Sequence, residues 1–177
     1  MTLATMVSSW LMAGGEAAAT ADMKQVERPF VPSKELSAAD FVLIDMLNSA
    51  GHEDVCYCVC DPAVTDSPII FASSGFCDFT GYTSPEIEGR NCRFLQGKET
   101  AAEDIARIRK ALEGYAQGAS SEPISVNLLN YRKDGTSFCN EFFLAPLRDS
   151  SKKLQYLIGV QCPVSHLGPG QAPSNAG

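Results

Sequence analysis

Hydrophobic and polar side chains alternate with a period of two along much of the second half of the chain. The alternation covers residues 123–132, 136–146 and 154–162 and is typical of strands that bury one face. Two shorter runs, at 55–60 and 68–72, have the length and the β-branched and aromatic content of further strands. We therefore expect five strands.

The pattern between these two groups of strands changes to helical spacing. Residues 74–115 are rich in helix signals, and Thr100 and Glu103 have the spacing of a capping box that opens a longer helix. Asp134-Gly135 predicts a hairpin turn between the third and fourth strands. Two strands, then helices, then three antiparallel strands predict an α+β domain in which one five-stranded antiparallel sheet carries short helices on one face.

We expect the chain to divide into four segments. They are an N-terminal extension at 1–36, a flanking helix at 37–53, a core domain at 54–162 and a disordered tail at 163–177. An amphipathic helical stripe in the extension is formed by Leu3, Met6, Val7, Trp10 and Leu11. The flanking helix has Ser37 as its expected N-cap and is apolar around more than half of its circumference. Both helices therefore need a surface to pack on, either the core domain or another protein chain.

Charge and composition argue against several kinds of partner. The net charge is −7 and the basic residues are scattered, whereas nucleic-acid binding needs a basic face. No apolar run approaches the ~20 residues that a membrane span requires. The seven cysteines lack the spacing of a zinc site or a disulfide scaffold. We therefore expect no metal site, reduced thiols and a cytoplasmic location, with the nucleus as the alternative.

Carboxamides interrupt the apolar rows of the last three strands. Asn130, Asn140 and Gln161 each share a strand face with apolar residues or glycine, among them Phe142, Leu144 and Gly159. The hairpin is expected to place Asn130 nearly opposite Asn140. A buried amide without a partner costs about 1–3 kcal/mol, so each should have one. Backbone or water would satisfy any single amide near a strand end, but the convergence of three favours a ligand edge with both donors and acceptors.

One octapeptide surrounds a cysteine with polar and basic groups. Its sequence is Gly89-Arg90-Asn91-Cys92-Arg93-Phe94-Leu95-Gln96. A structural cysteine does not need these neighbours, whereas a thiol beside a polar cofactor that carries a phosphate does. Arg93 suits such a phosphate, because guanidinium groups bind its oxygens in pairs, and so does Arg109. Arg109 is also an ordinary residue for a solvated helix face, and its position alone leaves both interpretations open.

The octapeptide resembles the core motif of the LOV (light-oxygen-voltage) domains, which are flavin-binding blue-light sensors of the PAS superfamily. The resemblance covers about Cys58 to Gln161 and includes the segments 68–73, 80–83, 130–135 and 158–161. It implies the PAS fold and FMN as cofactor, with FAD as the alternative. It also implies that blue light causes a reversible bond between flavin carbon C4a and the sulfur of Cys92.

The resemblance further implies a role for each matched position. Arg93 and Arg109 would hold the phosphate, Asn91 and Gln96 the ribityl chain, and Asn130 and Asn140 the pyrimidine edge. Gln161 would lie beside flavin N5 and change its hydrogen bonds when N5 gains a proton. The remaining expected cofactor contacts are Leu95, Phe142, Leu144 and Gly159.

Other thiols depart from the family pattern. Cys56, Cys58 and Cys60 point the same way in the expected first strand, where they either fill space or tune adduct lifetime and redox behaviour. Cys139 is expected to point away from the flavin. Cys92 itself is under opposing influences, because a neighbouring arginine lowers a thiol pKa and an apolar environment raises it.

No kinase, phosphodiesterase or DNA-binding signature accompanies the core domain, which predicts a photosensory module and not an enzyme. Its output is expected to pass through the N-terminal helices, to a protein partner or within a homodimer. Two alternatives are a sensory fragment of a larger light-regulated kinase or transcription factor, and a flavin-based redox sensor. Replacing Cys92 with alanine separates the redox sensor from the photoreceptor.

Overall fold

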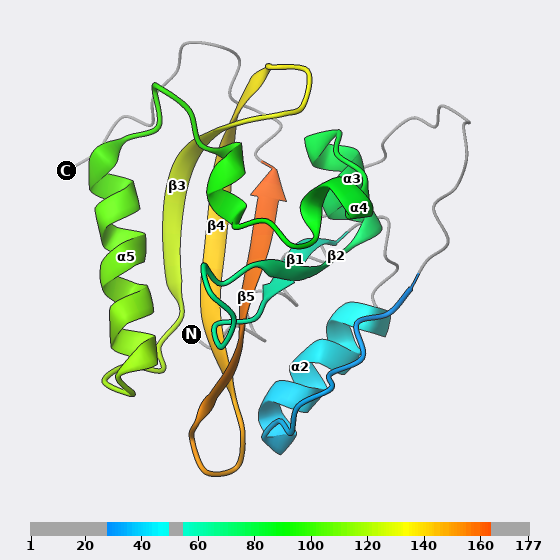
Figure 1. Cartoon of the computed structure of the whole chain (residues 1–177), viewed down its shortest axis with the longest axis vertical. Coiled ribbons are helices and arrows are strands. Elements are labelled where there is room, and N and C mark those ends of the chain that lie inside the picture. Colours follow the sequence, from blue (N-terminus) through cyan, green and yellow to red (C-terminus); the bar gives the residue numbers. More distant parts are fainter. Residues whose placement is uncertain (1–27, 50–54, 164–177) are drawn as a thin grey trace, which may run out of the picture.

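The strands form a single antiparallel sheet in the order β2-β1-β5-β4-β3 (Figure 1). The computed structural model describes residues 28–49 and 55–163. The strands are β1 (Cys56–Cys60), β2 (Ile69–Ala72), β3 (Ile124–Tyr131), β4 (Ser137–Arg148) and β5 (Leu154–Pro163). The predicted five-stranded antiparallel sheet and the α+β class are confirmed.

The segment between β2 and β3 is helical, as predicted. It contains α3 (Ser74–Thr80), α4 (Ser84–Ile87), the 3-10 helix η1 (Cys92–Leu95) and α5 (Ala102–Ala116). Buried side chains of these helices, such as Phe76, Leu95 and Tyr115, share one core with Val126 and Leu128 of β3. One face of the sheet is thereby covered.

The opposite face of the sheet is covered by the flanking helix α2 (Ala38–Ser49). Leu43, Ile44 and Leu47 of this helix pack with Tyr57 and Ile158 of the sheet in a second core, which we call the outer core. Ser37 is the N-cap that the sequence predicts, since its Oγ accepts a hydrogen bond from the Asp40 amide at 3.2 Å. The helices between the strands thus lie on one face, as expected, and α2 lies on the other.

The residues before α2 run alongside this helix (Figure 1). The hydroxyl of Tyr156 accepts hydrogen bonds from the backbone amides of Ser33 at 3.1 Å and Lys34 at 2.9 Å. Phe30 is buried in the outer core and exchanges two hydrogen bonds with Asn48. The predicted amphipathic stripe at residues 3–11 and the tail beyond Pro163 lie outside the described residues.

Two local predictions about turns and caps have different outcomes. The hairpin turn at Asp134-Gly135 is confirmed, with Gly135 in the left-handed region at φ +85°. The capping box at Thr100 is wrong, because α5 has Ala101 as its N-cap. Thr100 Oγ1 instead donates to the Leu129 carbonyl at 2.6 Å, so a tertiary contact uses the hydroxyl.

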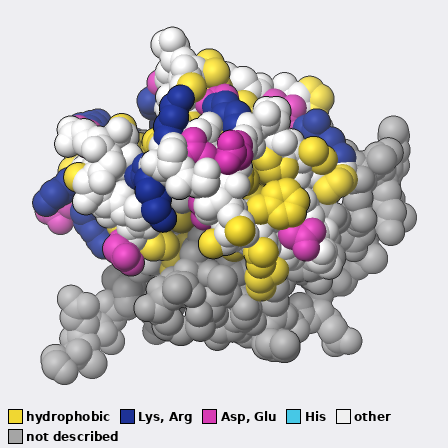
Figure 2. All heavy atoms as spheres, turned by 90° about the horizontal axis from the view of Figure 1, so that it is seen from below, with side chains coloured by type: hydrophobic (Ala, Val, Ile, Leu, Met, Phe, Trp, Pro, Cys, Tyr) yellow, Lys and Arg dark blue, Asp and Glu magenta, His cyan; other side chains and the backbone are white. Residues whose placement is uncertain are grey.

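The surface near the start of α2 is apolar. Phe41 and Val42 are each 55% exposed, and hydrophobic side chains gather on the side of the molecule where α2 lies (Figure 2). The apolar circumference of the flanking helix is therefore only partly buried. Among the described residues, no helix combines the length and the hydrophobicity needed to cross a membrane.

Candidate functional site

The candidate site lies where the helix-covered face of the sheet meets η1. Strand β1 contributes three thiols to this face, because Cys56, Cys58 and Cys60 belong to the same core as the helices. Hydrogen bonding to Cys58 and burial raise the pKa of Cys60 well above its ordinary value. Within the described part of the chain, no disulfide forms among Cys56, Cys58, Cys60, Cys77, Cys92 and Cys139.

All three carboxamides singled out in the sequence are buried. Asn130, Asn140 and Gln161 are 3%, 2% and 3% exposed, respectively. Asn140 Nδ2 donates to Asn130 Oδ1 at 2.9 Å, which brings two of the amides together.

The expected alignment of the two asparagines is corrected by the strand register. Asn130 pairs with Phe138, and Leu128 pairs with Asn140. The asparagines are therefore diagonal neighbours, not opposite ones, because the loop that closes at Arg132 and Thr136 fixes the register.

An unsatisfied acceptor remains in this group. Asn140 Oδ1 is buried and has no hydrogen-bond partner within the described structure. Leaving such a group unpaired costs about 1–3 kcal/mol. A planar ligand that presents N–H donors and carbonyl acceptors along one edge would satisfy it, and the pyrimidine edge of a flavin has this pattern. The amides therefore fit the cofactor that the sequence resemblance implies.

Gln161 has two sulfur atoms as neighbours. Cys56 Sγ lies 3.5 Å from Gln161 Oε1, and Gln161 Nε2 lies 4.0 Å from Cys58 Sγ. Thiols form weak hydrogen bonds, so the amide orientation is held only loosely. The sequence did not reveal these contacts, although the shared face of the β1 cysteines was the signal for them.

Gly159 makes room beside this amide. A Cβ atom at this position would lie only 2.5 Å from Phe142 Cε2 on the neighbouring strand. Phe142 and Leu144 are both buried on this face. The glycine therefore lets the Phe142 ring lie across β5.

The reactive-cysteine candidate lies at the first position of η1. Asn91 is the N-cap, and its Oδ1 accepts a hydrogen bond from the Arg93 amide at 3.0 Å. The sulfur of Cys92 lies 3.9 Å from the same oxygen. Leu95 is buried in the helix-side core, and Gln96 caps the end of η1.

The opposing influences on the Cys92 thiol have a clear outcome. Burial raises the pKa of Cys92 to about 12, and the charge of Cys58 acts in the same direction. The Arg93 guanidinium lowers this pKa, while Asp66 opposes that effect. The thiol is therefore neutral at physiological pH.

Asp66 is a residue that the sequence analysis missed. Both of its carboxylate oxygens lie 2.7 Å from Arg93 Nη1, and its backbone carbonyl accepts a hydrogen bond from Asn91 Nδ2 at 2.5 Å. It thus contacts both sequence neighbours of Cys92. Its place in the loop between β1 and β2 is far from the octapeptide in sequence, and no local signal marks it.

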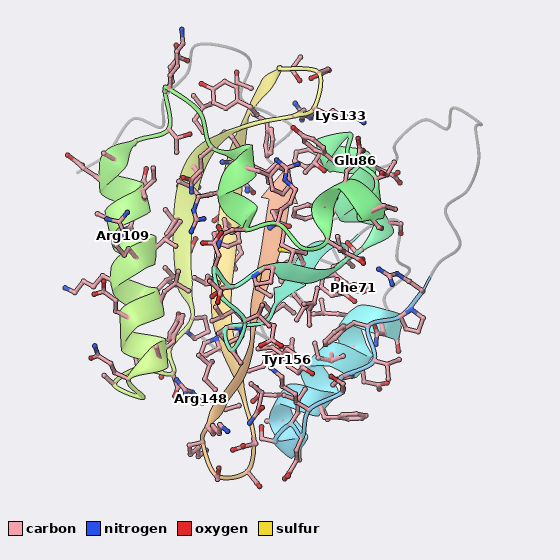
Figure 3. All side chains as sticks on the ribbon, in the orientation of Figure 1. Phe71, Glu86, Arg109, Lys133, Arg148 and Tyr156 are labelled. Carbon is pink, nitrogen blue, oxygen red and sulfur yellow. The ribbon has the colours of Figure 1, made fainter. Side chains whose placement is uncertain are left out.

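Arg109 and Cys139 lie apart from these contacts. Arg109 is an exposed residue of α5 (Figure 3), and nothing in the described part of the chain bonds to its guanidinium. Its contact with a cofactor phosphate stays a prediction. Cys139 is half-buried and pairs with Leu129, between the inward-facing positions of β4.

Comparisons with known proteins agree with this geometry. The PAS domain family matches residues 54–161. Phototropin-2 of Oryza sativa subsp. japonica is 43% identical over 127 residues, which span 71% of this chain but only 13% of that relative.

Two solved structures extend the comparison. A light-oxygen-voltage domain studied with a flavin analogue has 43% identity and a TM-score of 0.64, covering 73% of this chain and 90% of its own. The light-state dimer of the fungal blue-light photoreceptor Vivid has 32% identity and a TM-score of 0.55, covering 61% of this chain and 76% of its own. Since the PAS match spans more than half of the sequence and the matched structure is a light-oxygen-voltage domain, the chain belongs to the PAS family and, within it, to the LOV domains.

Proposed function

We propose that this chain is a blue-light photosensory module that binds FMN and uses Cys92 as its photoreactive group. The observation that carries the proposal is the unpaired, buried Asn140 oxygen among carboxamides on the same side of the sheet as Cys92. When bound, the flavin absorbs blue light and offers carbon C4a to a sulfur atom. The family membership supports this assignment.

The residues of the chain divide the remaining tasks. Cys92 supplies a sulfur and a proton, because its thiol is neutral. Asn130 and Asn140 orient the pyrimidine edge, and Gln161 senses the proton at N5. Among the described residues, the thiols of Cys56 and Cys58 are the hydrogen-bond partners of the Gln161 amide, so the amide turns over without breaking a strong hydrogen bond to them.

FMN is proposed over FAD because the connection between η1 and α5 is short and carries no insertion. Arg93 is 59% exposed on its side chain and reaches solvent at the edge of the site, and Arg109 is exposed as well. Only residues 96–101 separate η1 from α5. Mass spectrometry of the cofactor released from the purified protein distinguishes FMN from FAD.

The test of the proposal is visible spectroscopy of the Cys92→Ala variant. The parent protein should show a flavin band that bleaches in blue light and returns in the dark, because the sulfur bond interrupts flavin conjugation. Cys92→Ala should keep the band and lose this reversible bleaching. Cys139→Ala is the matched control and should behave like the parent, since Cys139 is not among the inward-facing residues of β4.

Three different results would each have a defined meaning. Parent protein without any flavin would refute the proposal. Reversible bleaching that survives in Cys92→Ala would assign the bond to another group. A flavin band that does not bleach in the parent would favour the second candidate, a flavin redox sensor, for which the thiols of Cys56 and Cys58 beside Gln161 are the supporting observation.

The proposed output is a change in association. α2 exposes Phe41 and Val42, and exposed apolar side chains of this kind suit docking to a second copy of the chain or to another protein. A photosensory module without enzymatic activity of its own would need such docking to pass on its signal. Because phototropin-2 is far longer than this chain, a sensory part of a larger light-regulated protein is the alternative. The absence of disulfides among the described thiols suits the cytoplasm or the nucleus as the location.

A further inference from the structure

Arg93, the residue next to the photoreactive cysteine, is already engaged by a carboxylate. Arg93 Nη1 lies 2.7 Å from each carboxylate oxygen of Asp66. Both contacts use the same nitrogen, and a phosphate bound by Arg93 would draw on the same guanidinium charge, because guanidinium groups bind both carboxylates and phosphates. The two anions therefore compete for one cation.

Asp66 is held where it is by the backbone. Its φ is +69°, and its carbonyl oxygen accepts the hydrogen bond of Asn91 Nδ2 at 2.5 Å. The next residue, Ser67, also has a positive φ of +46°. Left-handed conformations are uncommon for residues other than glycine, aspartate and asparagine being the frequent exceptions. The loop between β1 and β2 thus presents this carboxylate to Arg93.

We propose that Asp66 is a specificity-determining residue, which occupies Arg93 and thereby lowers the preference of the site for a phosphorylated flavin over an unphosphorylated one. This inference rests on the proposed flavin-binding function. A phosphate that reaches Arg93 must displace the carboxylate or share the guanidinium with it. Riboflavin has no phosphate, so its binding leaves the pair intact.

The size of the effect follows from the exposure of the pair. The side chains of Arg93 and Asp66 are 59% and 54% exposed, so solvent screens their attraction. A phosphate can therefore displace the carboxylate, and Asp66 weakens FMN binding without preventing it. Removing the carboxylate should raise the ratio of FMN affinity to riboflavin affinity by about 1.4- to fivefold, the range expected for an exposed ion pair.

Asp66→Asn is the test substitution, because asparagine tolerates a positive φ and the backbone carbonyl that bonds Asn91 stays in place. Flavin-free protein is titrated with FMN and with riboflavin, and binding is followed by quenching of flavin fluorescence. We expect tighter FMN binding and unchanged riboflavin binding. Asp66→Gly serves as a second variant, since glycine also adopts this φ without strain.

Two controls isolate the ion pair. Asp104→Asn removes a carboxylate from the Arg107 pair on α5, which leaves Arg93 and Asp66 untouched, and it should leave the affinity ratio unchanged. In an Arg93→Gln background, Asp66→Asn should no longer change the ratio. An unchanged or lower ratio in both Asp66 variants would overturn the inference.

The same titrations separate this inference from the proposed function. If the parent protein binds neither flavin, the proposed function fails and this inference falls with it. If the parent binds both flavins and the Asp66 variants show the parental ratio, only this inference is wrong.

Discussion

At the scale of single residues, Cys92 is kept uncharged in a setting that would otherwise favour a thiolate. It begins a short helix and precedes Arg93, and both features lower the pKa of a thiol. Burial outweighs them, and Asp66 offsets part of the arginine charge. A neutral thiol brings its own proton, which suits a reaction in which sulfur and proton both move to the flavin.

The neutral thiol predicts how bleaching depends on pH. The pKa of Cys92 is raised from its ordinary 9.0 to about 12, so the folded protein keeps this proton throughout the range below 9. The yield of reversible bleaching per light flash should therefore be constant between about pH 6 and 9. Flash spectroscopy across this range measures it, and a sigmoidal rise with a midpoint below 9 would show that a thiolate reacts.

The same shift affects stability in a defined direction. Because the folded pKa is raised, Cys92 favours the folded state below its unfolded pKa, and this contribution is lost as the pH rises from about 9 towards 12. Denaturant midpoints of the parent should fall more steeply across that window than those of Cys92→Ala. Equal slopes would show that another group dominates.

At the scale of elements, Tyr156 holds the segment before α2 on the outer face of the sheet. Its ring packs edge-on against Phe30 at 5.5 Å between centroids, and Phe30 also contacts Phe71 at 5.4 Å; Figure 3 labels Tyr156 and Phe71. The hydroxyl accepts two backbone hydrogen bonds, from Ser33 and Lys34. A buried hydroxyl in β5 thus ties the N-terminal segment to the strand that also carries Gln161.

Replacing Tyr156 with phenylalanine should release this segment. Both amides lose their acceptor, and each hydrogen bond is worth about 0.5–1.5 kcal/mol. Amide exchange at Ser33 and Lys34 should become about two- to tenfold faster, as measured by hydrogen–deuterium exchange. Tyr57→Phe is the control, since that hydroxyl bonds the side chain of Asn48 and should leave these two amides unaffected. Unchanged exchange in Tyr156→Phe would mean that packing alone holds the segment.

The alternation of inward-facing and outward-facing side chains along each strand was predictable, because it depends only on which face of the strand is buried. The inward set of β3 and β4, including Asn130 and Asn140, follows from the sequence for this reason. The register between them did not, since it depends on how the hairpin loop closes. The cap at Thr100 failed because a distant carbonyl, that of Leu129, takes its hydroxyl.

The charged part of the candidate site was less predictable, because it also depends on contacts between residues that are far apart in the sequence. Arg93 is marked by its motif, but Asp66 approaches it only through the three-dimensional path of the loop between β1 and β2. The octapeptide sequence does not indicate the course of this loop. Arg109 is exposed on α5, which is compatible both with a phosphate contact and with an ordinary solvated arginine, so its role stays a prediction.

At the scale of the whole molecule, the sheet is covered on both faces, but α2 leaves apolar surface exposed. Phe41 and Val42 lie on the solvent side of a helix whose other side packs on the sheet. Contiguous exposed apolar groups of this kind mark interaction surfaces. The light-state dimer of the similar protein Vivid makes association a natural output to test.

Substituting both residues with glutamine should weaken association. Glutamine keeps a helix-forming side chain and removes the apolar contact. Size-exclusion chromatography with light scattering, in darkness and under blue light, should show the parent dimer and a variant that dissociates at about tenfold higher concentration. Val64→Gln, another exposed apolar residue but in the loop after β1, is the control. A parent that is monomeric in both conditions would exclude a homodimer and direct the search to a different partner.

The two-sided packing of β1 has a consequence for engineering and for evolution. Its residues alternate between two environments, Cys56, Cys58 and Cys60 on one side and Tyr57 and Val59 on the other. Substitutions at the first set change the side of the sheet that carries the candidate flavin site, whereas the second set packs in the core beneath α2. The site-facing side of β1 can therefore vary in sequence without altering the contacts that hold α2 on the sheet.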